Sequence, residues 1–363
     1  MVGIMKTNNC NTTSNNSNTK PATRKIANWS SYNRSLVQRG NLSVYVSEAM
    51  ANKAFLKPKK DHRNGHPLEY SNDLILLMLT IRELFRLPLR QTAGFVSGLL
   101  QSMKLDWPLP DYSTVSRRMG KLQVDFCHKF HGQNIVLLLD SSGFKVFGEG
   151  EWKVRKHGYS YRRTWRETHI AIDYQSRDIV GLINTKSGVH DNTQLRPLLK
   201  QVRTRIGSCN TWLGSNGRPG QQTAGNGPKI ATIIGDGAYD AKDNYLLAKK
   251  LSLEEGSTMT FIAPPPKNAT INVSGSRRNG IYDTPGWEER NDIVLRIDDI
   301  GTDKWKQEVG YHRRSLVENA FYRMKTIFGS NLKSRKTTTQ YAEQCLRASL
   351  INRFNQLGLP SYC

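Results

Sequence analysis

The sequence predicts an α/β protein in which a mixed sheet, flanked by helices, follows an all-helical amino-terminal unit. Two features of the chain carry this prediction. Between residues 70 and 130, apolar residues recur at helical spacing and prolines separate the segments. After residue 130, short apolar runs of strand length alternate with helical segments.

The composition indicates a polyanionic partner. The chain has 363 residues, enough for one large domain or two smaller ones, and 37% of them are apolar, enough for a core. Lysine and arginine number 53 against 30 acidic residues, which gives a formal net charge of +23. Because such an excess causes self-repulsion, we expect the chain to bind a polyanion such as DNA or RNA.

The chain carries no signal for export or for a membrane span. It has no run of about 18 apolar residues, and its start lacks the apolar core of a secretory signal. The five cysteines are scattered and include no Cys-x-x-Cys pair, which argues against a zinc site or a disulfide framework. We therefore expect no membrane partner and a reduced, intracellular location.

Residues 1–40 are rich in Asn, Ser and Thr, and the first acidic residue of the chain is Glu48. This composition predicts a basic, largely disordered arm. The arm is either a solubilising tail or a segment that lies on DNA. Aromatic residues from Trp29 onward indicate that a docked segment begins near Asn28.

The sequence pattern of residues 41–130 predicts a helical DNA-binding domain. Ser71 is placed to cap the first of three short helices, and Asp111 opens the third. Such a trio resembles a helix-turn-helix unit, although an ordinary helical bundle fits the pattern equally well. The candidate base-reading residues at the start of the third helix are Ser113, Thr114, Ser116, Arg117 and Arg118.

Two predicted strands end in an acid. Residues 134–140 form an apolar run that ends at Asp140, and residues 229–236 form another that ends at Asp236 between glycines. Such positions lie at the edge where open α/β sheets bind ligands. A turn-forming or capping role is the alternative for Asp140, because Ser141-Ser142-Gly143 follows it and favours a turn.

Further strands and helices complete the predicted sheet domain. Residues 168–174 and 179–185 are predicted strands, which makes an antiparallel meander after residue 134. His190, which precedes Asp191 and a predicted helix, is taken as a loop or capping residue. Residues 268–300 are polar and are predicted to be mostly loop.

Residues 144–166 combine cations with aromatic rings. This density predicts a strand pair that grips a phosphate backbone, with rings available to stack on bases; a solvated β-hairpin is the alternative. The candidate DNA-binding residues in this stretch are Lys153, Arg155, Lys156, Arg162 and Arg163.

A predicted helix at residues 311–325 presents one carboxylate between two cations and a phenol. At roughly 100° per residue, its polar positions fall within about 60° of one another on one face. These positions are Tyr311, Arg314, Glu318 and Lys325. The arrangement suits a metal-bound acid beside a phosphate-binding strip, whereas a solvated face with salt-bridge partners is the alternative.

Together these motifs resemble a known family. Asp140 in Leu-Leu-Leu-Asp-Ser-Ser-Gly, Asp236 in Gly-Asp-Gly-Ala-Tyr-Asp, and the Tyr-x₂-Arg-x₃-Glu-x₆-Lys signature that ends at Lys325 are similar to the DDE transposases of bacterial insertion sequences. The resemblance covers roughly residues 28–355. It implies a ribonuclease H-like catalytic domain.

The resulting domain prediction has four parts. These are a basic arm at residues 1–40, the helical DNA-binding domain at 41–130, a catalytic domain at 131–357 with an insertion at about 241–300, and a tail at 358–363.

The resemblance also implies an activity and its residues. The family's enzymes cut transposon ends and join the freed 3′-hydroxyls to target DNA, using two Mg²⁺ ions, with Mn²⁺ as an alternative ion. Asp140 would hold both ions, and Asp236 and Glu318 one each. Arg314 and Lys325 would hold phosphates near the scissile bond, and Tyr311 would position the DNA.

The expected partners are double-stranded DNA at the transposon ends and the target, with the protein as a homodimer on DNA. The expected location is the bacterial cytoplasm, in association with the nucleoid. Two alternatives remain at this point. One is a non-catalytic DNA-binding protein derived from a transposase, and the other is a ribonuclease H-like nuclease that cuts without strand transfer.

Overall fold

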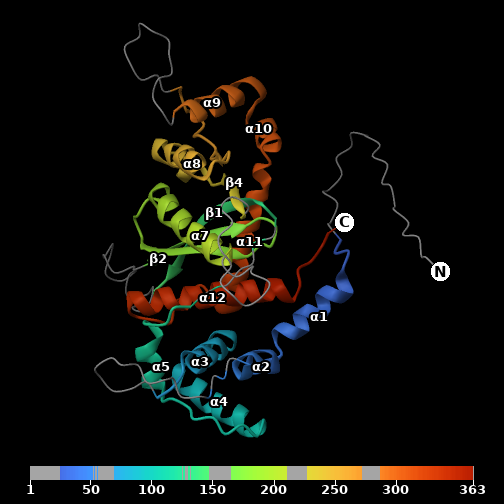
Figure 1. Ribbon diagram of the computed structural model, residues 1–363, viewed down its shortest axis with the longest axis vertical. Coiled ribbons are helices and arrows are strands. Elements are labelled where there is room, and N and C mark those ends of the chain that lie inside the picture. Colours follow the sequence, from blue (N-terminus) through green and yellow to red (C-terminus); the bar gives the residue numbers. More distant parts are fainter. Residues whose placement is uncertain are drawn as a thin grey trace, which may run out of the picture.

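A five-stranded mixed sheet forms the centre of the protein (Figure 1). The computed structural model describes residues 25–51, 53, 55, 69–124, 126, 130, 132–146, 165–210, 227–271 and 287–362. The strands are β1 (Asn134–Lys145), β2 (Trp165–Asp173), β3 (Ile179–Lys186), β4 (Lys229–Ile234) and β5 (Thr260–Ile262).

The strand order is β3-β2-β1-β4-β5. The first three strands form the predicted antiparallel meander, while β4 pairs parallel to β1 and β5 pairs parallel to β4. A three-strand meander extended by parallel strands on the side of β1 is the topology of a ribonuclease H-like sheet. The predicted fold class is confirmed.

Strand β1 is longer than predicted. The sequence placed a turn directly after Asp140, but the strand continues to Lys145. Its polar second half pairs residue for residue with β2, including Ser141 with His169 and Gly143 with Glu167. This long-range pairing satisfies the backbone hydrogen bonds that a turn would otherwise have to supply.

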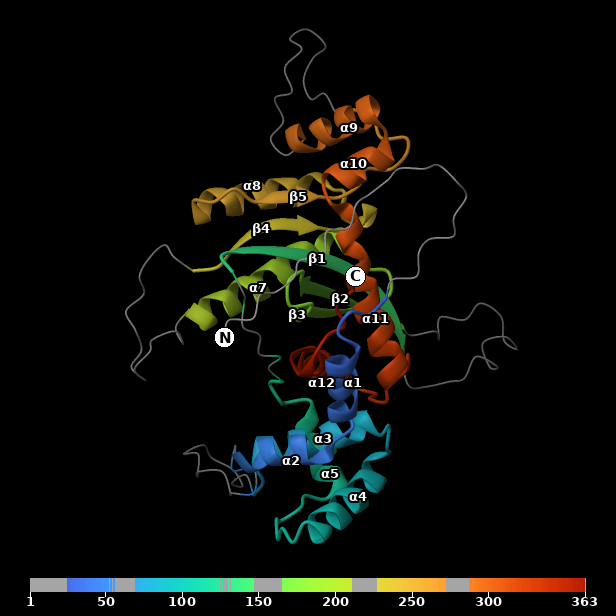
Figure 2. The ribbon, with the colours of Figure 1, turned by 90° about the vertical axis from the view of Figure 1, so that its right-hand side faces the viewer.

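Helices cover both faces of the sheet (Figure 2). Because side chains alternate along β1, Leu137 and Leu139 pack in one apolar cluster and Leu138 packs in the other. The first cluster lies under α7 (Leu195–Asn210) and α8 (Lys242–Glu255). The second lies under α11 (Ser315–Phe328) and α12 (Thr337–Leu357).

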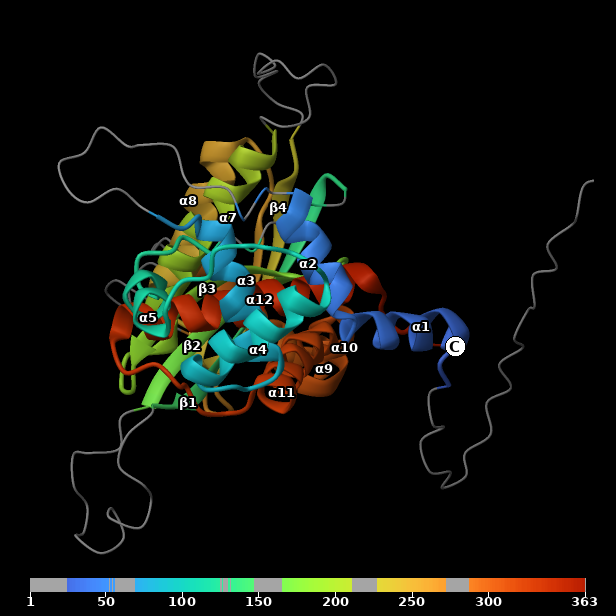
Figure 3. The ribbon, with the colours of Figure 1, turned by 90° about the horizontal axis from the view of Figure 1, so that it is seen from below.

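Helix α12 lies between the sheet and the amino-terminal helices, and is buried on both sides (Figures 1 and 3). Those helices are α2 (Leu42–Ala51), α3 (Asn72–Leu84), α4 (Leu89–Ser102) and α5 (Tyr112–Met119). Ser71 and Asp111 cap α3 and α5 with their side chains, as predicted. One apolar cluster runs from α2–α5 to the sheet, so the helical unit shares its core with the sheet domain.

A buried ion network fastens α3 to α12. The fully buried Arg347 guanidinium donates to Glu83 at 3.0 Å and to Glu343 at 2.7 Å. Glu343 also accepts from the backbone amides of Lys333 and Ser334, each at 2.9 Å. Each of these buried charges therefore has a partner of opposite charge.

The docked segment predicted from Asn28 onward is confirmed, so the boundary of the disordered arm at residue 40 is corrected. This segment forms α1 (Trp29–Arg39), which packs on the carboxyl-terminal end of α12. Arg39 donates to the carbonyl of Gly358 at 2.8 Å, and Asn28 donates to that of Leu359 at 3.0 Å. The predicted tail thus supplies the carbonyl acceptors that hold this segment. Residues 1–24 lie outside the described residues.

The predicted insertion at 241–300 is also corrected. Helix α8 and strand β5 belong to the sheet layer, because β5 extends the sheet beside β4. Beyond residues 272–286, which the structure does not describe, α9 (Glu288–Ile300) is helical where the sequence predicted loop, and α10 (Thr302–Glu308) follows it. Arg290 of α9 is buried and pairs with Asp240 at 3.0 Å, a contact that no local pattern reveals.

Across the described part of the chain, no helix combines the length and apolar character needed to cross a membrane.

Candidate active site

Asp140 and Asp236 lie beside each other where β4 ends. Leu138 and Ile234 form the last pair between these two parallel strands, and each acid lies two residues beyond that pair. Asp236 accepts the backbone amide of Ala238 at 3.1 Å and so caps the short 3₁₀ turn Gly237–Tyr239. This pairing places the two predicted acids side by side, although Asp140 lies within β1 and not at its end.

Gly235 gives the Tyr239 ring room at the strand end. A Cβ at this position would lie 3.0 Å from that ring, so the ring would have to shift by a few tenths of an ångström.

Helix α11 brings the signature residues to the same edge (Figure 2). Tyr311–Arg314 form a 3₁₀ turn rather than the predicted α-helix, and the α-helix begins at Ser315. The Arg314 guanidinium lies 3.3 Å from the Asp140 carboxylate and also contacts that of Glu318. Arg314 therefore lies between the first and the third acid.

Burial and mutual repulsion disfavour the charged acids. Burial raises the pKa of Asp140 to about 6, with Asp236 and Glu318 adding to the rise, while the Arg314 guanidinium opposes it. Burial likewise raises the pKa of Asp236, Arg314 opposes this, and the nearby carboxylate of Asp191 adds to it. A positive charge at this edge would relieve the repulsion.

The donor set fits a divalent cation only in part. Within the described residues, no group of three or more acidic, histidine or cysteine side chains is close enough to hold a metal ion. Asp140 and Asp236 offer the hard carboxylate oxygens that Mg²⁺ prefers, and Asp140 is only 15% exposed. Glu318 is 55% exposed and pairs with Arg314 instead, so it must reorient to join them.

Lys325 and Tyr311 lie close to the acids. The Lys325 ammonium donates to Ser142, two residues beyond Asp140 on β1, at 2.7 Å. The ring of Tyr311 lies 6.0 Å from the Arg314 guanidinium. All four signature residues therefore lie on the surface of the protein that contains Asp140, as their helical spacing predicted.

The two arginines of α5 differ in their contacts. Arg118 donates to the carbonyl of Tyr70 and to the side chain of Asn72, so it fastens α5 to the start of α3. Arg117 is exposed and donates only within its own helix, to Thr114 at 3.2 Å. This geometry suits Arg117, but not Arg118, for contact with DNA.

The cations predicted to grip DNA in residues 147–164 all fall outside the described residues. They are Lys153, Arg155, Lys156, Arg162 and Arg163. Their role stays a prediction.

The structure adds residues that the sequence did not single out. Asp191 and Glu167 approach Ser141, and Asp191 accepts the Ser141 hydroxyl at 2.8 Å. In the sequence only the neighbouring His190 was considered, as a loop or capping residue, and no motif singled out Asp191. Tyr322, 68% exposed, lies one helical turn after Glu318; the helical spacing that selected Glu318 also places Tyr322 on that face.

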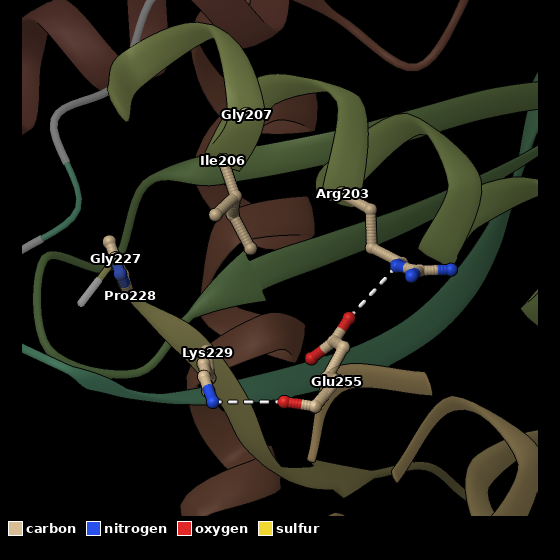
Figure 4. Close-up of a pocket in the computed structure, with 7 residues that line it drawn as sticks. All are labelled: Arg203, Ile206, Gly207, Gly227, Pro228, Lys229 and Glu255. Carbon is tan, nitrogen blue, oxygen red and sulfur yellow. Dashed lines mark hydrogen bonds and ion pairs between the residues drawn. The ribbon is translucent and has the colours of Figure 1, made fainter. Parts of the chain in front are cut away.

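A separate pocket of about 330 Å³ lies at the opposite end of β4 (Figure 4). Glu255 closes one side of it, accepting Arg203 on its carboxylate and Lys229 on its backbone carbonyl, each at 2.9 Å. Because Lys229 begins β4 and Asp236 follows its end, this pocket is not part of the acid site.

Comparisons with known proteins agree with this geometry. A family model described as a transposase DDE domain matches residues 131–353, and a second model with the same description matches residues 37–149. The first match covers more than half of the chain, so the chain belongs to the DDE transposase family. It is a DNA transposase, an enzyme that cleaves and transfers DNA strands, and its family generally uses divalent metal ions.

Among solved structures, the chain is similar to the Drosophila P element transposase strand transfer complex. The two chains share 9% sequence identity over 88% of this chain and 89% of that chain, with a TM-score of 0.30.

Proposed function

We propose that this transposase serves a bacterial insertion sequence. It binds the two ends of the element, hydrolyses a phosphodiester bond at each, and joins the freed 3′-hydroxyls to target DNA. It does so as a homodimer on double-stranded DNA, at the nucleoid of its host. The observation that carries the proposal is the pair of half-buried acids, Asp140 and Asp236, side by side on neighbouring strands and next to the signature helix α11.

Two Mg²⁺ ions, or Mn²⁺ in their place, would be held by three carboxylates. Asp140 would contribute to both ions, Asp236 to one and Glu318 to the other. The raised pKa values of Asp140 and Asp236 support this assignment, because they indicate carboxylates that lack sufficient positive charge. When bound, the ions supply a lowered pKa for the attacking hydroxyl and stabilise the leaving oxygen.

The cations of α11 would then bind the DNA backbone. Arg314 leaves the carboxylates when a phosphate offers it a bidentate partner, which frees Glu318 to turn toward Asp140. Lys325, held by Ser142, places its ammonium two residues from Asp140, near the scissile phosphate. Tyr311 lies against the Arg314 end of this strip and orients the DNA.

The test is a strand-transfer assay with purified full-length protein, a library of labelled candidate ends, a target plasmid and Mg²⁺. We expect joined products from the wild type and from Asp298→Asn, which changes an exposed acid outside the site. Asp140→Asn, Asp236→Asn and Glu318→Gln should bind DNA without forming products.

The other outcomes identify the alternatives. Cut but unjoined products from the wild type would indicate a nuclease. Binding by the wild type without cutting would indicate a non-catalytic DNA-binding derivative. Scattering mass measurements on the protein bound to one labelled end pair test the homodimer directly.

A further inference from the structure

A second polar cluster lies on the other face of β1. Side chains alternate along the strand, so Ser142 meets Lys325 of α11 whereas Ser141 points to the opposite face. There the Ser141 hydroxyl donates to Asp191, the first residue of the 3₁₀ turn Asp191–Gln194. No function assigned above uses Asp191.

Asp191 is held in a fixed position. One carboxylate oxygen accepts the Ser141 hydroxyl at 2.8 Å, and the other lies 3.5 Å from Nδ1 of His169. The His169 ring is fully buried, and its Nε2 lies 2.9 Å from the Thr185 hydroxyl. Since Asp191 is itself only 17% exposed, its carboxylate has little freedom to turn away from the sheet edge.

Asp191 and Asp236 lack cationic partners of their own. Among the described residues, Arg314 pairs with Asp140 and Glu318, but no lysine or arginine pairs with Asp191 or Asp236. The two acids lie near each other, because the 3₁₀ turns that begin beside them are in contact. Two neighbouring carboxylates in a partly buried site repel each other, and a nearby positive charge relieves this repulsion.

A buried phenol next to these acids also lacks a partner. Tyr239 is fully buried, and within the described structure its hydroxyl makes no hydrogen bond. The pKa of this phenol is raised, first by burial and then by the negative charges of Asp191 and Asp236. An unpaired buried hydroxyl is unfavourable, so a polar species is expected to reach it. The side-chain oxygen of Asn192 is buried and unpaired as well.

A hydrated cation satisfies all of these groups at once. Mg²⁺ keeps several of its waters and uses only one or two carboxylates, and ordered waters make two to four hydrogen bonds each. The single charge of Arg314 is already shared between Asp140 and Glu318, and among the described residues no lysine or arginine pairs with Asp191 or Asp236. The first divalent cation to enter without DNA therefore meets Asp236 and Asp191.

We propose that Asp191 is a fourth carboxylate of the acid site, which together with Asp236 holds a hydrated divalent cation whose water shell contacts the Tyr239 hydroxyl. Asp191 acts through that water shell and is a positioning residue. The proposal rests on the proposed function, in which Asp236 binds a divalent ion.

The test is a Mn²⁺ titration of the full-length protein without DNA, followed by calorimetry or by loss of the free Mn²⁺ electron paramagnetic resonance signal. The variants are Asp191→Asn and Tyr239→Phe, with Asp236→Asn as reference and Asp298→Asn as control. We expect Asp191→Asn to weaken binding by about 10–100-fold, as for other outer-shell groups. Tyr239→Phe should weaken it less, without loss of thermal stability, since it removes a hydroxyl that has no partner.

Several outcomes would overturn the inference. In the first, Asp191→Asn and Tyr239→Phe bind Mn²⁺ as tightly as the wild type, whereas Asp236→Asn does not bind it. That result would refute the role of Asp191 but would leave the proposed function intact. In the second, Asp191→Asn lowers the thermal stability of the protein and Tyr239→Phe has normal Mn²⁺ affinity. Asp191 would then have a structural role only. Absence of Mn²⁺ binding to the wild type also contradicts the inference. If Asp236→Asn itself binds Mn²⁺ as the wild type does, the metal assignment of the proposed function and this inference both fail.

Discussion

The guanidinium of Arg314 lies 3.3 Å from the carboxylate of Asp140, and the same guanidinium contacts Glu318. One signature cation thus pairs with two acids of the site. The pKa of Arg314 is raised by these acids and its guanidinium remains protonated, although burial opposes the rise. The third acid can join the other two only after Arg314 moves.

Arg314→Ala should bind Mn²⁺ more tightly than the wild type when no DNA is present. Removing the competing cation frees Asp140 and Glu318, and we expect about a tenfold gain in affinity, equivalent to about 1.4 kcal/mol. Strand cleavage should nevertheless fall by about 100-fold or more, because the phosphate loses its clamp. Calorimetry and the cleavage assay measure the two effects. Arg296→Ala, an arginine paired with surface acids on α9, is the control, and unchanged Mn²⁺ affinity in Arg314→Ala would contradict the prediction.

Asp140→Asn should stabilise the metal-free protein at neutral and alkaline pH. The usual pKa of 3.8 rises to about 6 in the folded protein, mainly through burial. The folded state therefore binds this proton more strongly, and stability is lost as the pH rises from about 4 through 6. The variant lacks this loss, so its free energy of unfolding should exceed that of the wild type by on the order of 2 kcal/mol at pH 8. Near pH 4 the two proteins should be alike.

Denaturant unfolding in a chelator at the two pH values provides the measurement. A stability difference that is equal at pH 4 and pH 8 would show that Asp140 is not the group responsible.

Arg347→Met should destabilise the protein severely. The substitution leaves Glu343 buried without its cation and leaves Glu83 with only the Arg82 guanidinium at 3.5 Å, which costs about 3–5 kcal/mol. Because Glu83 lies on α3 and Glu343 on α12, the loss should separate the helical unit from the sheet domain. Thermal unfolding checks this, with Arg296→Met as the surface control. A single unfolding transition at the wild-type temperature would rule out the stabilising role of the network.

Substitutions of Arg117 and Arg118 should affect different properties, namely DNA binding for Arg117 and thermal stability for Arg118. Arg118→Ala removes the contacts to Tyr70 and Asn72, so it should lower the melting temperature. Arg117→Ala breaks only a contact within its own helix and should leave the melting temperature unchanged. If Arg117 reads a base, its loss should cost about 1–3 kcal/mol of binding to transposon ends and little of binding to random DNA. An equal loss on both DNAs would make Arg117 a phosphate contact.

Local sequence patterns determined the strands, the helix caps and the candidate acids. Ser71 and Asp111 cap the helices they were expected to cap, and the apolar runs before Asp140 and Asp236 form parallel neighbours. These features depend on hydrophobic periodicity and on hydrogen bonds between residues a few positions apart. Such interactions depend only on short stretches of sequence. The motifs and the family resemblance were therefore sufficient to predict the fold class and to select the acids.

Tertiary structure alone decided how the side chains meet. Strand β1 continues past Asp140 because it pairs with β2, and α9 is linked to Asp240 by the ion pair of Arg290. Other long-range contacts bring Arg314 against Asp140, and Asp191 against Ser141, fifty positions away along the chain. Each depends on which buried charges and backbone groups find partners once the chain is compact, and that competition among distant groups has no signature in any local stretch of sequence.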